Sequence, residues 1–433
     1  MLDLATYMER RELSPEEVRR ALLERLSCAT ANTETGDLNA LLAQQRVTAL
    51  FAGSLVEGLG NDRSDIDLYC LMEETGSIPV DFPGTFIITL AGTMIVDVEL
   101  HEWAAIQARL ERLAAHPADA VRDFRETVRF SPGDLKLLHA LSIGEPLLLT
   151  DAPASGNQVS ADLKNLQEAI DRRSLARLIF DRASAYMLSY LTDCLGALEA
   201  RDKESTEFLL NTLYWQLVGA ILSVAGETNP AEKWRPLLLK RLTADEARFN
   251  AATFGHPGLA TLIEAGPVTP SPGLSGLRER YRHLAAYIHL YLPFGTYLFT
   301  HNRPLGDPQF DWAGGPPLNG SRKRLPRLHP ELMTRHTPEG IQLSRPGKVS
   351  TQLLNLTGFR FLTAFTGDLP DAEAIDRLSR STGLTPWEVE DQLELLTRFL
   401  EQSGYLDLRG PIRSPLPVNQ APHQGIRHVT HTA

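Results

Sequence analysis

The chain has 433 residues, 43% hydrophobic and 22% charged, which is enough apolar material for roughly two to four domains of ordinary size. Its formal net charge of −11 argues against a surface that neutralises many phosphates, so a small substrate is favoured and nucleic acid is not an expected partner. No run approaches the roughly 18 apolar residues of a membrane span, and the amino terminus lacks the apolar core of a secretory signal. We therefore expect a cytoplasmic protein without a membrane partner.

The first 100 residues have the pattern of a helix followed by short strands. The capping box SPEE at 14–17 predicts a helix over about 14–27. Residues 46–52 are apolar and partly β-branched, and they run into Gly53-Ser54, which is typical of a buried strand that ends in a tight turn. Further strands are expected at residues 66–71, 85–90 and 94–100. Together these segments predict a small mixed sheet.

The pattern changes after this region. Between 151 and 300, apolar residues recur at three- and four-residue spacing, which predicts a helical domain. Residues 301–349 are rich in Pro, Gly and Arg and are expected to be a linker or an extended arm. Residues 350–408 are expected to form a third compact unit, and 409–433 a disordered tail. The elements expected in the third unit are helices at about 350–365, 371–382 and 385–402 and a strand at 405–408.

The clearest chemical signal lies around the first two strands. Asp65 and Asp67 are two residues apart on a predicted strand, so they face the same side and repel each other unless a cation lies between them. Carboxylate oxygens suit Mg²⁺. Just upstream, Gly53 allows the backbone to approach a phosphate, and Ser54 offers a hydroxyl and an amide at the start of a short helix, where an anion is favoured. The sequence thus pairs a phosphate cradle with a metal site.

A third carboxylate is expected from the strand at 94–100. Asp97 and Glu99 lie on the same face of that strand, and the spacing alone does not choose between them. With a third carboxylate, one ion would activate the attacking oxygen and a second would hold the triphosphate.

The order GS-x-x-x-G, then SD-I-D-L, then D-x-E on a later strand, resembles the nucleotidyltransferase signature of the DNA polymerase β-like superfamily. The resemblance implies an α+β fold, with a small mixed-sheet catalytic domain at about 1–150 followed by the helical domain. It also implies that Asp65, Asp67 and the third carboxylate bind the metals. Asp97 is favoured as the third ligand because it follows an apolar pair, and Glu99 is kept as a second ligand or general base.

By the same resemblance, Gly53 and Ser54 contact the β and γ phosphates. The helical region is similar to the domain that follows the catalytic domain in antibiotic-modifying nucleotidyltransferases, where Lys233 of AEKW would reach the triphosphate; the alternative is an ordinary helix lysine beside a packed tryptophan. Residues 350–408 resemble small winged-helix modules, which implies either a site for a peptide or protein partner or a structural cap on the helical domain.

The expected function is Mg²⁺-dependent transfer of a nucleoside monophosphate, AMP from ATP by family frequency, to a hydroxyl or similar group of a small-molecule or natural-product acceptor. Pyrophosphate would be released with the help of two ions. Two alternatives stay open. One is nucleotidylation of a protein or RNA, which a basic arm at 321–348 would support, and the other is a catalytically silent protein that binds a nucleotide or peptide.

Overall fold

The computed structural model describes most of the chain. The described residues are 1–30 (backbone alone at 28–30), 47–72, 84–90, 94–120, 130–149, 163–268, 273–303, 305, 324–346 and 352–408. The expected boundary at residue 150, much of the expected arm and the expected tail at 409–433 lie outside them. The chain divides into two compact units, Met1–Ala185 with Val218–Phe249 and Tyr297–Leu305, and Tyr186–Leu217 with Asn250–Thr296 and Gly306–Ala433.

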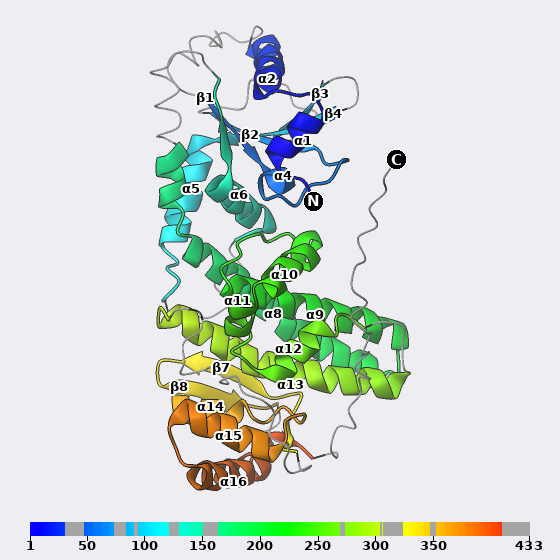
Figure 1. The fold of residues 1–433 in the computed structure, drawn as a ribbon, viewed down its shortest axis with the longest axis vertical. Coiled ribbons are helices and arrows are strands. Elements are labelled where there is room, and N and C mark those ends of the chain that lie inside the picture. Colours follow the sequence, from blue (N-terminus) through cyan, green and yellow to red (C-terminus); the bar gives the residue numbers. More distant parts are fainter. Residues whose placement is uncertain are drawn as a thin grey trace, which may run out of the picture. The chain divides into compact units, whose positions relative to one another are not determined.

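The first unit contains a five-stranded mixed sheet in the order β3-β4-β2-β1-β5 (Figure 1). The strands are β1 (Val47–Ala52), β2 (Ile66–Met72), β3 (Thr85–Leu90), β4 (Met94–Glu102) and β5 (Glu145–Leu147). β2 and β4 run parallel, and the other neighbouring pairs run antiparallel. The mixed sheet predicted from alternating apolar residues is therefore confirmed, and the fold class is α+β.

Helices cover both faces of this sheet. Side chains of α1 (Leu4–Arg10) and α2 (Pro15–Thr30) pack with Leu68 and Cys70 of β2 on one face. Side chains of α5 (Trp103–Ala114) and α6 (Pro132–Ile143) pack with Tyr69 and Leu71 on the other. Because side chains alternate along a strand, Asp67 shares the face of Tyr69, and the acidic positions of β2 and β4 point to the side of α5 and α6.

Helices make up most of the described residues between 163 and 303, as the apolar spacing predicted. They are α8 (Arg172–Glu199), α9 (Lys203–Val224), the short 3-10 helix η2 (Glu232–Trp234), α10 (Arg235–Ala244), α11 (Glu246–Ala252), α12 (Pro257–Glu264) and α13 (Leu274–Thr300). Among the described helices only α9 is long and apolar enough to cross a membrane, and 61% of its apolar 18-residue stretch is buried inside the protein. Such burial is typical of a helix that packs in a protein core.

The second unit holds two small sheets and three helices in its carboxyl-terminal part. Its elements there are β6 (Arg327–Leu328), β7 (Met333–Thr337), β8 (Gly340–Ser344), β9 (Gln352–Leu354), α14 (Leu356–Leu362), α15 (Asp371–Thr382), α16 (Pro386–Gln402) and β10 (Leu406–Asp407). β7, β8 and β9 form one sheet, and β6 pairs with β10. The helices predicted at 371–382 and 385–402 are confirmed, while the first predicted helix is shorter and follows a strand.

The described second half of the expected linker or extended arm at 301–349 contains short strands. β7 and β8 form a hairpin there, and β8 has the alternating burial of a half-buried strand. Ile341 and Leu343 point inward while their neighbours face outward. The alternation of buried and less buried residues spans only five residues, and the surrounding prolines and glycines made it hard to recognise in the sequence.

Candidate metal centre

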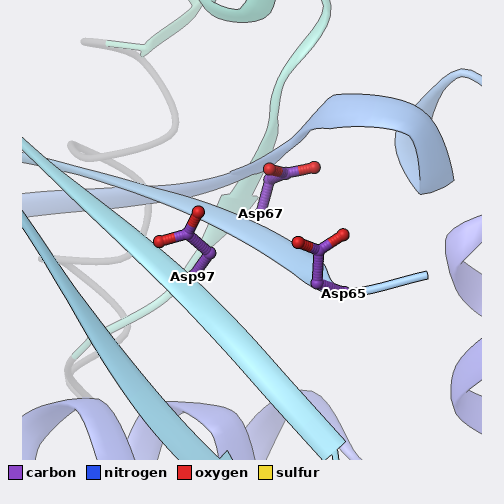
Figure 2. Close-up of side chains that lie close together, drawn as sticks. All are labelled: Asp65, Asp67 and Asp97. Atoms are coloured by element: carbon purple, nitrogen blue, oxygen red, sulfur yellow. The ribbon is translucent and has the colours of Figure 1, made fainter. Parts of the chain in front are cut away.

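Three aspartates converge at one end of the parallel pair of strands. Asp67 on β2 lies opposite Asp97 on β4, and Asp65 immediately precedes β2. One carboxylate oxygen from each residue lies within 4.8 Å of the others. Figure 2 shows the three carboxylates extending from neighbouring strands toward a shared space. Asp65 is exposed, whereas Asp67 and Asp97 are partly buried.

The ligand atoms of this centre suit Mg²⁺, because all three are carboxylate oxygens. Mg²⁺ binds oxygen at about 2.1 Å in octahedral geometry, so ligand oxygens of one ion are about 3.0 Å apart when adjacent and about 4.2 Å apart when opposite. The three aspartate oxygens, all within 4.8 Å of one another, are therefore close enough to be candidate ligands of one ion. Asp97 and not Glu99 is the third member of the cluster, because Asp97 is the residue in register with Asp67.

The Gly53–Ser54 turn lies directly against the aspartates. β1 ends at Ala52, which pairs with Asp67, and the four-residue helix α4 (Gly53–Val56) follows. Gly53 has φ +73°, a conformation that side chains disfavour, and a Cβ at this position would overlap the Asp67 carboxylate. Glycine is thus required both by the backbone conformation and by the closeness of the carboxylate.

Burial and neighbouring acidic residues raise the pKa of Asp67 and of Asp97. Burial, followed by the charge of Asp65, raises the pKa of Asp67 to about 6, against an opposing effect of Lys136. Burial and the charges of Glu99 and Asp65 raise the pKa of Asp97 as well. A bound cation would relieve this repulsion, so the centre is electrostatically suited to a metal ion.

Glu99 is engaged in a different interaction. Its Oε1 atom lies 2.7 Å from Nζ of Lys136 on α6, and its Oε2 atom lies 3.5 Å from Nε2 of His101. Burial raises the pKa of Glu99, but His101 and Lys136 lower it more, to about 2. A carboxylate with so low a pKa is a weak base, which makes Glu99 a poor general base in this arrangement.

Lys233, the second expected phosphate contact, lies in η2. Its Nζ atom is 5.0 Å from the centre of the Trp234 ring. Among the described residues, no hydrogen bond or ion pair connects Lys233 with the three aspartates. The arrangement is that of a lysine lying over a neighbouring tryptophan.

A buried cluster behind the Gly53–Ser54 turn was not foreseen from the sequence. Glu57, the residue that ends α4, accepts a 2.6 Å hydrogen bond from Asn229. Its other carboxylate oxygen lies 3.1 Å from Nε2 of His139, at an angle unsuited to a hydrogen bond. Nδ1 of His139 is in turn 3.0 Å from the Thr228 hydroxyl. The side chains of Glu57 and His139 are 11% and 8% exposed, so the residue that ends α4 is joined to residues 139 and 229 by buried polar contacts.

Lys136 was not among the site residues predicted from the sequence, although the start of its helix can be recognised there. The sequence SPGD at 131–134 is a capping box that opens α6, and Lys136 and His139 are three residues apart on the same side of that helix. The sequence does not say which strand this side faces.

Comparison with protein-family models gave no match, and comparison with curated proteins gave none either. The mixed sheet, the helical part and the aspartate triad are together compatible with a nucleotidyltransferase-like fold.

Proposed function

We propose that this protein is a Mg²⁺-dependent nucleotidyltransferase that transfers a nucleoside monophosphate, by default AMP from ATP, to a hydroxyl or similar group of a small-molecule acceptor. The observation that carries the proposal is the meeting of Asp65, Asp67 and Asp97 beside the Gly53 turn. A carboxylate cluster alone would fit many roles. A carboxylate cluster packed on a glycine turn, where a backbone can approach a phosphate closely, fits nucleotide chemistry better.

The site residues have separate roles in this proposal. Asp65, Asp67 and Asp97 hold the metal, which when bound supplies positive charge that offsets the charge of the phosphates. Gly53 and Ser54 contact the β and γ phosphates, and Lys233 is kept as a proposed contact of the triphosphate. The main contribution of the chain is to position the reactants and to stabilise developing charge.

The reaction is a displacement at the α-phosphorus. The acceptor oxygen forms a new bond to that phosphorus, and the bond from phosphorus to the oxygen that bridges to the β-phosphate breaks. Pyrophosphate leaves with the electron pair of that bond, and the acceptor proton passes to solvent. Glu99 is not assigned the role of base, because its ion pair with Lys136 keeps its pKa near 2.

A small acceptor is favoured over a protein or RNA. The basic arm at 321–348 was the main support for a macromolecular acceptor, and two of its arginines are used inside the protein. Arg327 is 3% exposed and lies 2.8 Å from Glu279, and Arg345 lies 3.1 Å from Glu331. The net charge of −11 also disfavours a polyanionic partner.

The acceptor class can be tested by mass spectrometry. The full chain is incubated with ATP, Mg²⁺ and pooled small-molecule extracts, and the Asp65→Asn variant is the control. A small compound that gains the mass of a nucleotidyl group with the wild type alone would support the proposal. The same gain on protein or RNA would favour the macromolecular alternative, and tight ATP binding without any adduct would favour the silent binding protein.

A further inference from the structure

Lys136 is a positive charge built into the edge of an acidic centre. Its Nζ atom lies 2.7 Å from Glu99, which is two residues from Asp97 on the same face of β4. Because Asp97 and Glu99 share one face of β4, the Lys136 ammonium group lies at the edge of the aspartate centre, opposite in charge to its carboxylates. The lysine therefore already supplies part of the charge balance that a metal ion would supply.

The backbone under Lys136 is held firmly, and its side chain is about half exposed. The capping box of α6 is formed in both directions between Ser131 and Asp134, and Arg109 lies 2.6 Å from the Asp134 carboxylate. The Lys136 side chain itself is 54% exposed. Lysine has a flexible stem with a compact charge, so the ammonium group can change partner without any movement of the helix.

This placement has opposite consequences for two ligands. A free divalent cation that enters the centre is repelled by the Lys136 ammonium group, which weakens its binding by roughly tenfold in a partly hydrated site. A cation that arrives with a triphosphate brings negative charge that offsets this repulsion.

We propose that the positive charge of Lys136 balances part of the negative charge of the aspartate centre. Lys136 thereby disfavours binding of the metal alone and favours binding of the metal together with a triphosphate. The inference rests on the proposed function and adds an order of binding to it. Under this order the centre stays largely free of metal until the nucleotide is present.

The test measures binding and not turnover. Mn²⁺ is used as a paramagnetic substitute for Mg²⁺, and its affinity is measured by electron paramagnetic resonance with and without the non-hydrolysable analogue α,β-methylene ATP. The variants are Lys136→Met, which keeps the length of the stem but removes the charge, and Lys136→Arg, which keeps the charge. Lys164→Met is the matched control, because Lys164 is 74% exposed and pairs only loosely with Glu168 at 3.8 Å.

We expect Lys136→Met to bind free Mn²⁺ roughly tenfold more tightly than the wild type and to lose most of the gain in Mn²⁺ affinity that the analogue gives. Lys136→Arg and Lys164→Met should behave like the wild type. Equal affinity of the wild type and Lys136→Met for free Mn²⁺, with the gain from the analogue intact in both, would overturn the inference and leave the proposed function standing. Absence of Mn²⁺ binding in every variant, with and without the analogue, would overturn both.

Discussion

Gly53 and Asp67 lie so close together that a β-carbon on residue 53 would occupy the place of the Asp67 carboxylate. The two residues belong to paired strands, since Ala52 at the end of β1 is opposite Asp67 on β2. The turn and the metal centre are therefore one structural unit, and a change in either should affect the other.

Replacement of Gly53 should damage both the turn and the centre. We expect Gly53→Ala to lower nucleotidyl transfer about 100-fold, because displacement of Asp67 by an ångström misplaces the reacting groups. Gly58→Ala is the matched control, since Gly58 also has a positive φ, +66°, but a β-carbon there meets no atom within 4 Å. Both variants should lose about 1 kcal/mol of unfolding free energy from the left-handed backbone. Equal activity of the two variants in a pyrophosphate assay would contradict the close coupling of Gly53 and Asp67.

Asp67 should destabilise the metal-free protein at neutral pH. Its pKa is raised from 3.8 to about 6, mainly by burial, so the folded state holds the Asp67 proton more tightly than the unfolded state does. Stability from this group is therefore present below about pH 4 and is lost as the pH rises to 6. We expect Asp67→Asn to increase the free energy of unfolding by up to roughly 3 kcal/mol at pH 7.5 with a chelator present, and to change it little at pH 3.5. Denaturant titrations at the two pH values measure the free energy of unfolding. An Asp67→Asn variant that is less stable than the wild type at pH 7.5 would show that the ionised Asp67 carboxylate does not destabilise the folded state.

The buried carboxylate of Glu57 should act as a positioning group for the Gly53–Ser54 turn. It accepts a hydrogen bond from Asn229 and lies beside His139. We expect Glu57→Ala to raise the KM for the triphosphate about tenfold, and the Glu57→Ala/Asn229→Ala double variant to be no worse than Glu57→Ala alone, because both changes break the same contact. Glu57→Gln, which keeps an acceptor for Asn229, should restore most of the affinity. Effects on KM that simply add would argue that Glu57 and Asn229 act separately.

Arg327 should matter for folding and not for binding of nucleic acid. It is 3% exposed and lies 2.8 Å from Glu279. Removal of one partner of a buried ion pair costs about 3–5 kcal/mol, so Arg327→Met should lower the unfolding free energy by about that amount. Arg335 on β7 is exposed, and Arg335→Met should change stability by less than about 0.5 kcal/mol. Urea denaturation compares the unfolding free energies of the two variants. A loss of RNA affinity in Arg335→Met would favour the alternative of a macromolecular acceptor.

The sequence predicted the mixed sheet well because local patterns define its parts. The strands at 85–90 and 94–102 alternate in burial, the strand at 66–72 is a short apolar run that is buried apart from Asp67, and the spacing of Asp65 and Asp67 places both on one side of the chain. The choice between Asp97 and Glu99 depended on strand register, which is a property of two segments and not of one. The contact of Lys136 with Glu99 spans 37 positions, and that of Asn229 with Glu57 spans 172, so no local pattern could reveal them.

The central claim is that Asp65 and Asp67 make this protein a nucleotidyltransferase. The most direct test is pyrophosphate release with each of the four nucleoside triphosphates, Mg²⁺ and pooled acceptor extracts, for the wild type and for the Asp65→Asn and Asp67→Asn variants. The proposal predicts that the wild type releases pyrophosphate with at least one triphosphate and that each variant loses most of this release. Unchanged pyrophosphate release in Asp67→Asn would contradict the claim. So would the absence of release from the wild type despite measurable nucleotide binding.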